Sequence, residues 1–388
     1  MRSLRWLVLG SLWLAGCRVE FVTGQLEAEG FETEPTQTSS TGSSTVAGST
    51  SLETDGLSSE SAAGETFLDT TGPRPECEAP KGHSICDTDD DPMHAIGLGC
   101  DSGPFDSTPV FEASLTSPDP AGFRVVRQFG NDAFVPREGV SLLVLSTGSL
   151  PEPDQSDVLL VPMGQAGEPG PGNGNPDGAA LPAPILAESG TNGTPFQGCD
   201  GVGDCSDSLP AAFGEGPAND LVWLQFEVDV PPGTFGYRAD IAWFSAEFPS
   251  KVGQPNDLFV WWQESESFTG NVAHLQDGTA MSATNLVETI IDRGIVGNNA
   301  ALLGTGFEGT TPSECSVPGG TYANCPRGAG TDWLELDGSI TPGERLQITV
   351  ALFDLGSADI DTTVMVDNWR WNCDGCRTGD DCGIHPPL

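Results

Sequence analysis

Short apolar runs separated by Gly- and Pro-rich turns make up most of the second half of the chain. In the clearest stretch, 239–262 (ADIAWFSAEFPSKVGQPNDLFVWW), two aromatic-rich runs flank a polar loop. Short apolar runs bounded by Gly or Pro favour buried strands over helices. Because such runs recur with little helical periodicity, we predict an all-β fold, an antiparallel β sandwich or jelly roll. The predicted strands are Leu142–Ser146, 158–161, 221–230, 237–244, 258–262, 333–336, 346–353 and 363–366.

Two further segments and one aromatic pair complete this pattern. Residues 283–295 fit a short amphipathic helix as well as a strand. Residues 164–180 are dense in Gly, Pro and Asn, and so predict an irregular surface loop. Strand alternation places one of Trp261 and Trp262 inside and the other outside, where its ring could stack on a sugar.

The chain is strongly acidic, with a formal net charge of −41 over 388 residues. Phosphate backbones repel such a chain, so we predict that it does not bind nucleic acid. Divalent cations and basic surfaces suit it better, although an acidic excess also keeps an exported protein soluble.

The N-terminus has the parts of a secretory signal. Arg2 and Arg5 precede an apolar core at 6–14, and Leu-Ala-Gly-Cys closes the segment at Cys17. The core is too short to cross a bilayer, and no later run reaches the ~20 apolar residues required. The ending resembles a bacterial lipobox, which implies that residues 1–16 are removed and that Cys17 is acylated. Residue 18 is Arg rather than Asp, which in lipoproteins of this kind fits outer-membrane rather than inner-membrane retention, so the resemblance implies a lipid anchor in the outer membrane and a surface-exposed domain. The alternative is an ordinary signal peptide.

A linker follows the signal. Half of the positions in 36–71 are Ser or Thr, and large apolar residues are scarce. Such a segment cannot bury enough surface to offset its ordering entropy, so we predict a disordered acidic linker over 17–76. The β domain, with a Cys-rich C-terminal tail, is placed at 77–388.

Ten cysteines remain when Cys17 is set aside, and in an exported chain an even number predicts up to five disulfides. The natural local pairs are Cys199–Cys205 and Cys315–Cys325. The other six allow several pairings, among which a link between the first three and the C-terminal three would tie the ends of the domain together. These six are Cys77, Cys86, Cys100, Cys373, Cys376 and Cys382.

The C-terminal cysteines also fit a different site. Cys373, Cys376, Cys382 and His385 have the composition of a Cys₃His zinc set. Export favours disulfides over this alternative.

Carboxylates at strand ends are the candidate metal ligands. Hard oxygen ligands are what Ca²⁺ requires, and a sandwich gathers its loops at one pole. We therefore predict a Ca²⁺ site, with the alternative that Glu247 and Asp257 cap turns or pair with Lys251 and Arg293. The predicted ligands are Glu247, Asp257, Asp354 and Asp361.

A second, weaker Ca²⁺ candidate precedes Pro92. Asp87, Asp89 and Asp91 alternate as in calcium loops, but the Gly and Glu of an EF-hand are missing. The alternative is a solvated acidic turn, with His94 as a packed or capping residue.

Two runs resemble a known family. The first is Phe-Ser-Ala-Glu-Phe-Pro at 244–249, followed by Asn-Asp-Leu-Phe at 256–259, and the second is 346–354 followed by 361–367. Over about residues 92–371 the chain resembles the choice-of-anchor L family of bacterial surface proteins. Ala246 departs from the usual Glu pair, and Thr362-Thr363 from the usual Ser-Ala. The resemblance implies a surface-exposed β domain, and it carries no catalytic residues to transfer.

Two classes of function are compatible with these observations. The first is a non-enzymatic surface module for adhesion, matrix assembly or the binding of a glycan or protein, with Ca²⁺ as the candidate cofactor. The second is an extracellular hydrolase of polysaccharide or protein. The four His residues lie in no recognisable catalytic motif, which favours the first class, although a carboxylate pair could serve glycoside cleavage.

Overall fold

A computed structural model describes most of the C-terminal part of the chain. The chain divides into two units, Met1–Thr70 and Thr71–Leu388, and every described residue belongs to the second. The predictions for the signal peptide, the linker, Cys17, Cys199, Cys205, Cys315 and Cys325 lie outside the described residues. The described residues are 76–80, 86–100, 108–162, 180–185, 218–248, 251–252, 257–276, 278–286, 300–308, 328–355, 360–378 and 380–386.

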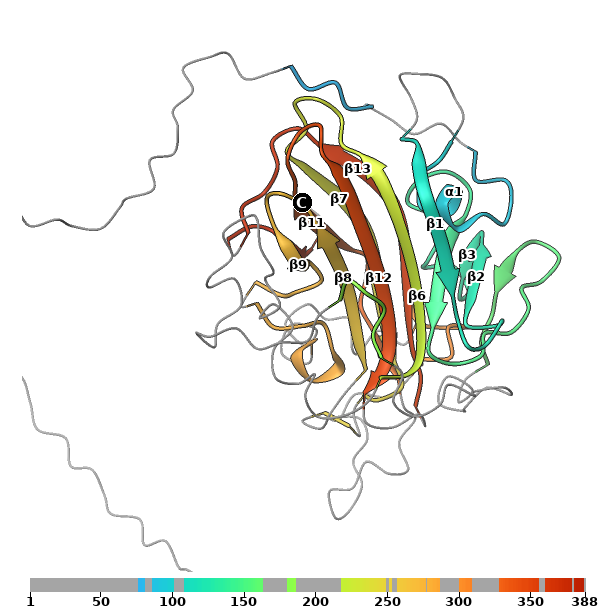
Figure 1. Cartoon of the computed structure of the whole chain (residues 1–388). Coiled ribbons are helices and arrows are strands. Elements are labelled where there is room, and N and C mark those ends of the chain that lie inside the picture. The colour runs from blue at the N-terminus through green and yellow to red at the C-terminus, as the bar shows by residue number, and fades with distance from the viewer. Residues whose placement is uncertain are drawn as a thin grey trace, which may run out of the picture. The chain divides into compact units, whose positions relative to one another are not determined.

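The domain is a sandwich of two antiparallel sheets, which confirms the all-β prediction (Figure 1). The five-stranded sheet has the order β1 (Val110–Thr116), β6 (Ala218–Asp229), β12 (Arg345–Leu355), β8 (Leu258–Glu264), β9 (Thr269–Asn271). The seven-stranded sheet has the order β14 (Gly383–His385), β11 (Leu334–Ser339), β7 (Gly236–Ser245), β13 (Thr362–Asn372), β4 (Leu142–Ser146), β2 (Phe123–Val126), with β10 (Ala329–Gly330) also beside β7. The short β3 (Gln128–Phe129) and β5 (Val158–Leu159) pair in parallel, and α1 (Pro92–Ala95) lies beside β1.

Both faces of the central strands are buried. One apolar cluster fills the space between the sheets and includes Trp243, Trp261 and Trp369. Two more clusters cover the outer faces, with Phe244 on one sheet and Trp262 on the other. This explains why the strands appear in the sequence as continuous apolar runs rather than as a strict alternation. The prediction that Trp261 or Trp262 is exposed is wrong, because the two side chains do face opposite ways but both faces are covered.

Three disulfides fasten the described domain. Cys77–Cys373 joins its beginning to the end of β13, and Cys86–Cys100 and Cys376–Cys382 close local loops. The predicted long-range link is therefore confirmed. The zinc alternative is wrong, because its three cysteines are disulfide-bonded and its histidine, His385, lies 2.6 Å from Asp337.

The helical segments are short. The described part of 283–295 makes one helical turn, in which the Leu286 N–H donates to the Ser282 carbonyl. No helix in the described ranges is long and apolar enough to cross a membrane.

The antiparallel order sets which strand ends lie together. In the five-stranded sheet, the start of β6 lies against the end of β12, and the end of β12 lies against the start of β8. In the seven-stranded sheet, the ends of β7 and β4 lie against the start of β13. We call the end of the sandwich where β6 begins and β12 finishes the pole (Figure 1).

Candidate functional site

Five buried carboxylates gather at the pole, and we call them the carboxylate cluster. Each lies at or next to a strand end: at the start of β6, after β7, before β8, at the end of β12 and before β13. All five are buried. Glu247 and Asp354 raise the pKa of Asp257, and Asp361 and Asp220 raise that of Asp354, so these carboxylates are close neighbours. The members are Asp220, Glu247, Asp257, Asp354 and Asp361. The structure thus brings together the four carboxylates predicted from the sequence and adds Asp220.

Hydrogen bonds and close packing fix the positions of Glu247, Asp257 and Asp361. Glu247 Oε2 accepts the N–H of Asp257 at 3.0 Å, so it does cap the turn between β7 and β8. Asp257 Oδ2 accepts the hydroxyl of Thr362 at 2.5 Å. A Cβ at Gly148 would lie 2.1 Å from the carboxylate of Asp361, so only glycine fits there. These contacts come from both sheets, and they fix the cluster at the end of the inter-sheet core.

Asp354 lies at the centre of the cluster. Its side chain is fully buried, and neither carboxylate oxygen accepts a hydrogen bond from the described residues. Burial raises the pKa of Asp354 well above its usual value; the nearby Thr147 hydroxyl opposes the shift, and the charges of Asp361 and Asp220 add to it. Asp354 pairs directly with Asn219 across β6 and β12, and the buried Asn219 Oδ1 also has no donor.

Asp257 is also buried, although it accepts a hydrogen bond from Thr362. Burial raises the pKa of its carboxyl well above the usual range, and the negative charges of Asp354 and Glu247 raise it further. No described Lys, Arg or His forms an ion pair with Asp257 or Asp354.

The energetic cost of this arrangement is large. An uncompensated buried charge costs several kcal/mol. Keeping a carboxyl protonated at pH 7 instead costs about 4 kcal/mol, since its unfolded pKa is near 3.9. Two such groups would therefore consume most of the roughly 5–15 kcal/mol by which a domain is stable. Both costs would be smaller if a positive charge lay close to these carboxylates.

Asn219 and Asp220 were missed by the sequence analysis, which began the strand at Leu221 instead of at Ala218. The sequence does contain a signal for Asp220: it directly precedes an apolar run, as Asp257 and Asp361 do. Asp220 adopts a φ of 48°, a left-handed conformation unusual inside a strand.

The second predicted set, Asp87, Asp89 and Asp91, does not form one site. Asp87 is buried and accepts the N–H groups of Val140 and Ser141 at 2.5 and 2.6 Å. Asp89 accepts from His94, whereas Asp91 caps α1 through the N–H of Met93. The acidic turn thus anchors a neighbouring loop and a helix, and the His94 side chain is held by Asp89.

A second group of buried carboxylates, the arginine network, lies on the outer face of the seven-stranded sheet. Arg238 bonds Asp337 at 2.6 Å, and Arg370 bridges Asp240 at 3.0 Å and Glu335 at 2.6 Å. Its members are Arg137, Arg238, Arg370, Asp240, Glu335, Asp337 and His385.

Two groups of three potential ligand residues in the described chain have ligand atoms within 4.8 Å of one another, and neither includes a member of the carboxylate cluster. Glu335, Asp337 and His385 belong to the arginine network, so cations of the chain already neutralise them. The group Cys376, Asp381 and Cys382 contains a disulfide, which leaves no thiolate. Neither group is therefore a metal site.

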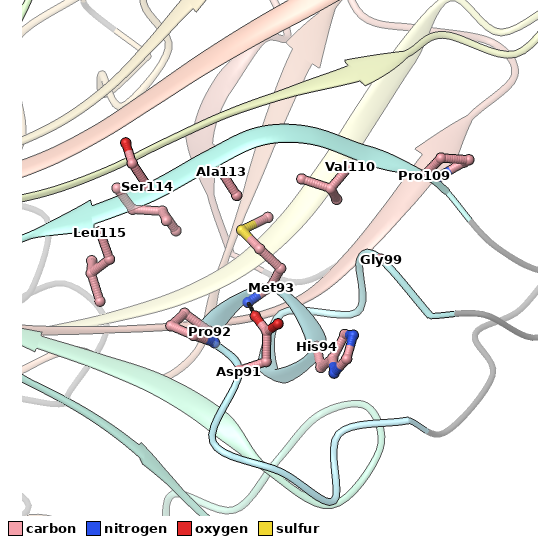
Figure 2. Close-up of a pocket in the computed structure, with 11 residues that line it drawn as sticks. Asp91, Pro92, Met93, His94, Gly99, Pro109, Val110, Ala113, Ser114 and Leu115 are labelled. Atoms are coloured by element: carbon pink, nitrogen blue, oxygen red, sulfur yellow. Dashed lines mark hydrogen bonds between the residues drawn. The ribbon is translucent and has the colours of Figure 1, made fainter.

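A pocket of about 430 Å³ lies between α1 and the edge strand β1. Figure 2 shows Met93 pointing from α1 toward β1, with Val110, Ala113, Ser114 and Leu115 along the facing wall. A bulge between Phe111 and Ser114 breaks the strand alternation, so that consecutive β1 residues line one wall. The volume lies within the usual range for small ligands or for one or two inserted side chains.

Polar groups mark the rim of this pocket. His94 Nδ1 lies 2.9 Å from Asp89 Oδ1. Burial lowers the pKa of His94, but the charges of Asp89 and Asp91 outweigh burial and raise it. The rim therefore carries an imidazole and a carboxylate beside an apolar floor.

Comparisons with protein-family models, with curated proteins and with solved structures returned no match. The interpretation of the site therefore depends on the geometry and chemistry of this chain.

Proposed function

We propose that this chain is an exported lipoprotein of the cell envelope that displays a non-enzymatic β sandwich as a binding module for an extracellular protein. The lipobox-like ending at Cys17 supplies the anchor in the outer membrane, and 17–76 is the spacer. The resemblance to the choice-of-anchor L family is in keeping with surface display. Three disulfides in the described domain support an oxidising compartment.

The observation that carries the proposal is the pocket at the free edge of β1. Among the described strands, β1 pairs with β6 alone. A protein ligand would insert an apolar side chain between Met93 and Leu115 and meet the polar rim.

A protein ligand is favoured over a glycan by the character of the exposed residues. Sugar-binding surfaces present exposed aromatic rings for stacking. The large apolar side chains that are exposed in the described ranges are all aliphatic: Val135, Leu160, Val252 and Leu303.

The hydrolase alternative is disfavoured by the burial of the paired carboxyls. Glycoside cleavage requires two carboxyls on either side of an accessible sugar, whereas Asp257 and Asp354 interact directly and both are buried at the pole. A polymer substrate would have no route to them without opening the sandwich.

The ligand test uses the purified full chain on arrays of immobilised peptides and of polysaccharides, scored separately for binding and for released products. Ser114→Arg places a long side chain in the pocket and should weaken peptide binding at least about tenfold. Thr116→Arg, exposed on the same strand but outside the pocket, is the control and should bind normally. Equal binding by both variants would overturn the pocket assignment, and released products would overturn the non-enzymatic one.

The anchor is tested separately. Cys17→Ser should move the protein from the membrane fraction to the soluble exported fraction, because acylation requires the thiol. Mass spectrometry of the N-terminal peptide should find a diacylglyceryl group on Cys17 of the unaltered chain. An unmodified peptide that begins elsewhere would refute the lipid anchor.

A further inference from the structure

The most demanding feature of the molecule is a carboxylate that the protein itself does not satisfy. Asp354 is 0% exposed, and neither of its oxygens has a hydrogen bond of good geometry among the described residues, although the Thr147 hydroxyl and the Asp257 carboxyl lie nearby. Buried carboxylates are ordinarily given several donors, as Asp87 is. A buried acceptor surrounded by further acceptors is a ligand set for a cation.

We propose that the pole of the sandwich is a Ca²⁺ site in which Asp354, Asp257 and Asn219 are the central ligands. Asp220, Asp361 and Glu247 supply further negative charge around it. This site is distinct from the ligand pocket beside α1, and the proposal does not depend on the proposed function.

The position of Asn219 supports a metal ion over a proton as the missing partner. Asn219 and Asp354 are directly paired on β6 and β12, so their side chains lie next to each other on one face. The amide oxygen Asn219 Oδ1 is also buried without a donor. A proton shared between Asp354 and Asp257 would leave this amide oxygen unsatisfied, whereas a cation coordinates both kinds of oxygen.

The donor set selects the metal. It consists of carboxylate and amide oxygens, with no imidazole or thiolate among the central ligands, which disfavours zinc. Mg²⁺ demands a compact octahedron and retains several waters. Ca²⁺ accepts longer bonds and a larger, irregular set of oxygens, which suits carboxylates and an amide contributed by several strand ends.

The bound ion would connect the two sheets. Asn219 and Asp354 belong to the five-stranded sheet, whereas Asp361 directly precedes β13 of the seven-stranded sheet. Asp257 is joined to the start of β13 through the Thr362 hydroxyl. Ca²⁺ at this place would draw the loops of the pole together and neutralise the charges that now repel one another.

The test compares thermal unfolding of the purified full chain in EDTA and in Ca²⁺, with calorimetric titration of CaCl₂ into chelator-treated protein. Ca²⁺ at about 100 times its Kd should raise Tm by roughly 5–10 °C. An unchanged Tm together with no binding heat would overturn the site. An equal rise in MgCl₂ would overturn the assignment to calcium.

Asp354→Asn distinguishes a metal ligand from a structural aspartate. Without Ca²⁺ the variant should be more stable than the unaltered chain, because one repelling charge is gone, and its calcium-dependent rise should disappear. Equal destabilisation in EDTA and in Ca²⁺ would show that Asp354 is structural only, and would refute the proposal. Should this variant fail to fold, Asn219→Asp provides the same decision, since an added carboxylate should lower Tm in EDTA and tighten Ca²⁺ binding.

Asp337→Asn is the matched control, because Asp337 is a buried aspartate whose charge is neutralised by Arg238 within the chain. This variant should lose stability equally in EDTA and in Ca²⁺ while keeping the full calcium-dependent rise in Tm. Loss of that rise in Asp337→Asn would show that the calcium effect does not report on the pole.

Discussion

Buried acids occur in two places in this sandwich, and their surroundings differ. In the arginine network, Asp240, Glu335 and Asp337 are each within ion-pair distance of an arginine of the same chain. At the pole, Asp257 and Asp354 are as deeply buried, and none of the described basic side chains pairs with either. The acids of the arginine network are paired with arginines of the same chain, whereas the described residues supply no such partner for Asp257 and Asp354.

The difference follows from where each group lies. The network is on a strand face, where alternate residues of β7, β11 and β13 put acids and arginines in register, as with Asp337 opposite Arg238. The pole collects strand ends, which contribute a carboxylate each, and the basic residue Lys251 lies beside Glu247, to whose carbonyl its N–H donates at 2.8 Å. With only 15 Lys and Arg in the whole chain, cations are scarce. A divalent ion is an efficient substitute, because it neutralises two carboxylates at once.

The largest expected loss of stability comes from removing an arginine from the arginine network, so that its buried acids lose a partner. Arg370→Met removes the guanidinium that contacts both Asp240 and Glu335 and leaves two buried acids without it. Breaking a buried pair in this way costs about 3–5 kcal/mol, measurable as a lower midpoint of urea unfolding. Ca²⁺ should not restore this loss, since the network's ligand atoms face the remaining arginines.

Arg345→Met is the control for this substitution. Arg345 also contacts two acids, Asp229 and Glu227, but it is exposed at the surface. Exposed pairs contribute little, so the control should unfold close to the unaltered chain. Recovery of Arg370→Met in Ca²⁺, or an equal loss in the control, would break the distinction between the two groups.

A smaller effect is expected at the edge of the pole. Gly148→Ala would put a methyl group 2.1 Å from Asp361 Oδ2, so the carboxylate must move. Forcing extra volume into a packed site costs about 1–3 kcal/mol, and the displaced charge should also reduce the calcium-dependent rise in Tm. Gly343→Ala controls for backbone strain, since Gly343 has a φ of +85° and open space around it. That control should lose stability and retain the whole calcium response; if Gly148→Ala did the same, Asp361 would have no part in the site.

The parts of the site that could be predicted are those marked by neighbouring residues in the sequence. Asp257 and Asp361 each precede an apolar run, and Glu247 and Asp354 lie at the ends of two others, so antiparallel order alone brings them to one end. Their convergence at the pole was therefore accessible from the sequence. That no described arginine pairs with Asp257 or Asp354 was not, because which basic residues face which acids depends on strand order.

In the fold, too, local features could be predicted from the sequence and non-local ones could not. The long apolar strands were recognised because both of their faces are buried, but their order was not, since β12 inserts between β6 and β8 by non-local pairing. The edge strand β1 was missed entirely. Its run Val-Phe-Glu-Ala-Ser-Leu-Thr is mostly exposed and is interrupted by a bulge, so neither alternation nor an apolar run marks it. The pocket that depends on β1 was unpredictable for the same reason.

The smallest effect concerns the titratable member of the network. His385 Nε2 lies 2.6 Å from Asp337, and this hydrogen bond raises the pKa of His385 although partial burial opposes the shift. A histidine whose pKa is higher in the folded state adds stability that is complete below its unfolded value of about 6.5 and is lost as pH rises through the folded value. His385→Gln should therefore lower the urea midpoint at pH 5 and leave it unchanged at pH 9. Solvent screening limits the loss to about 1 kcal/mol, because the side chain is only partly buried. The measurement is made in Ca²⁺ throughout so that the pole stays neutralised. A loss of the same size at both pH values would mean that His385 contributes packing alone, and that the network's charges are already balanced by its arginines.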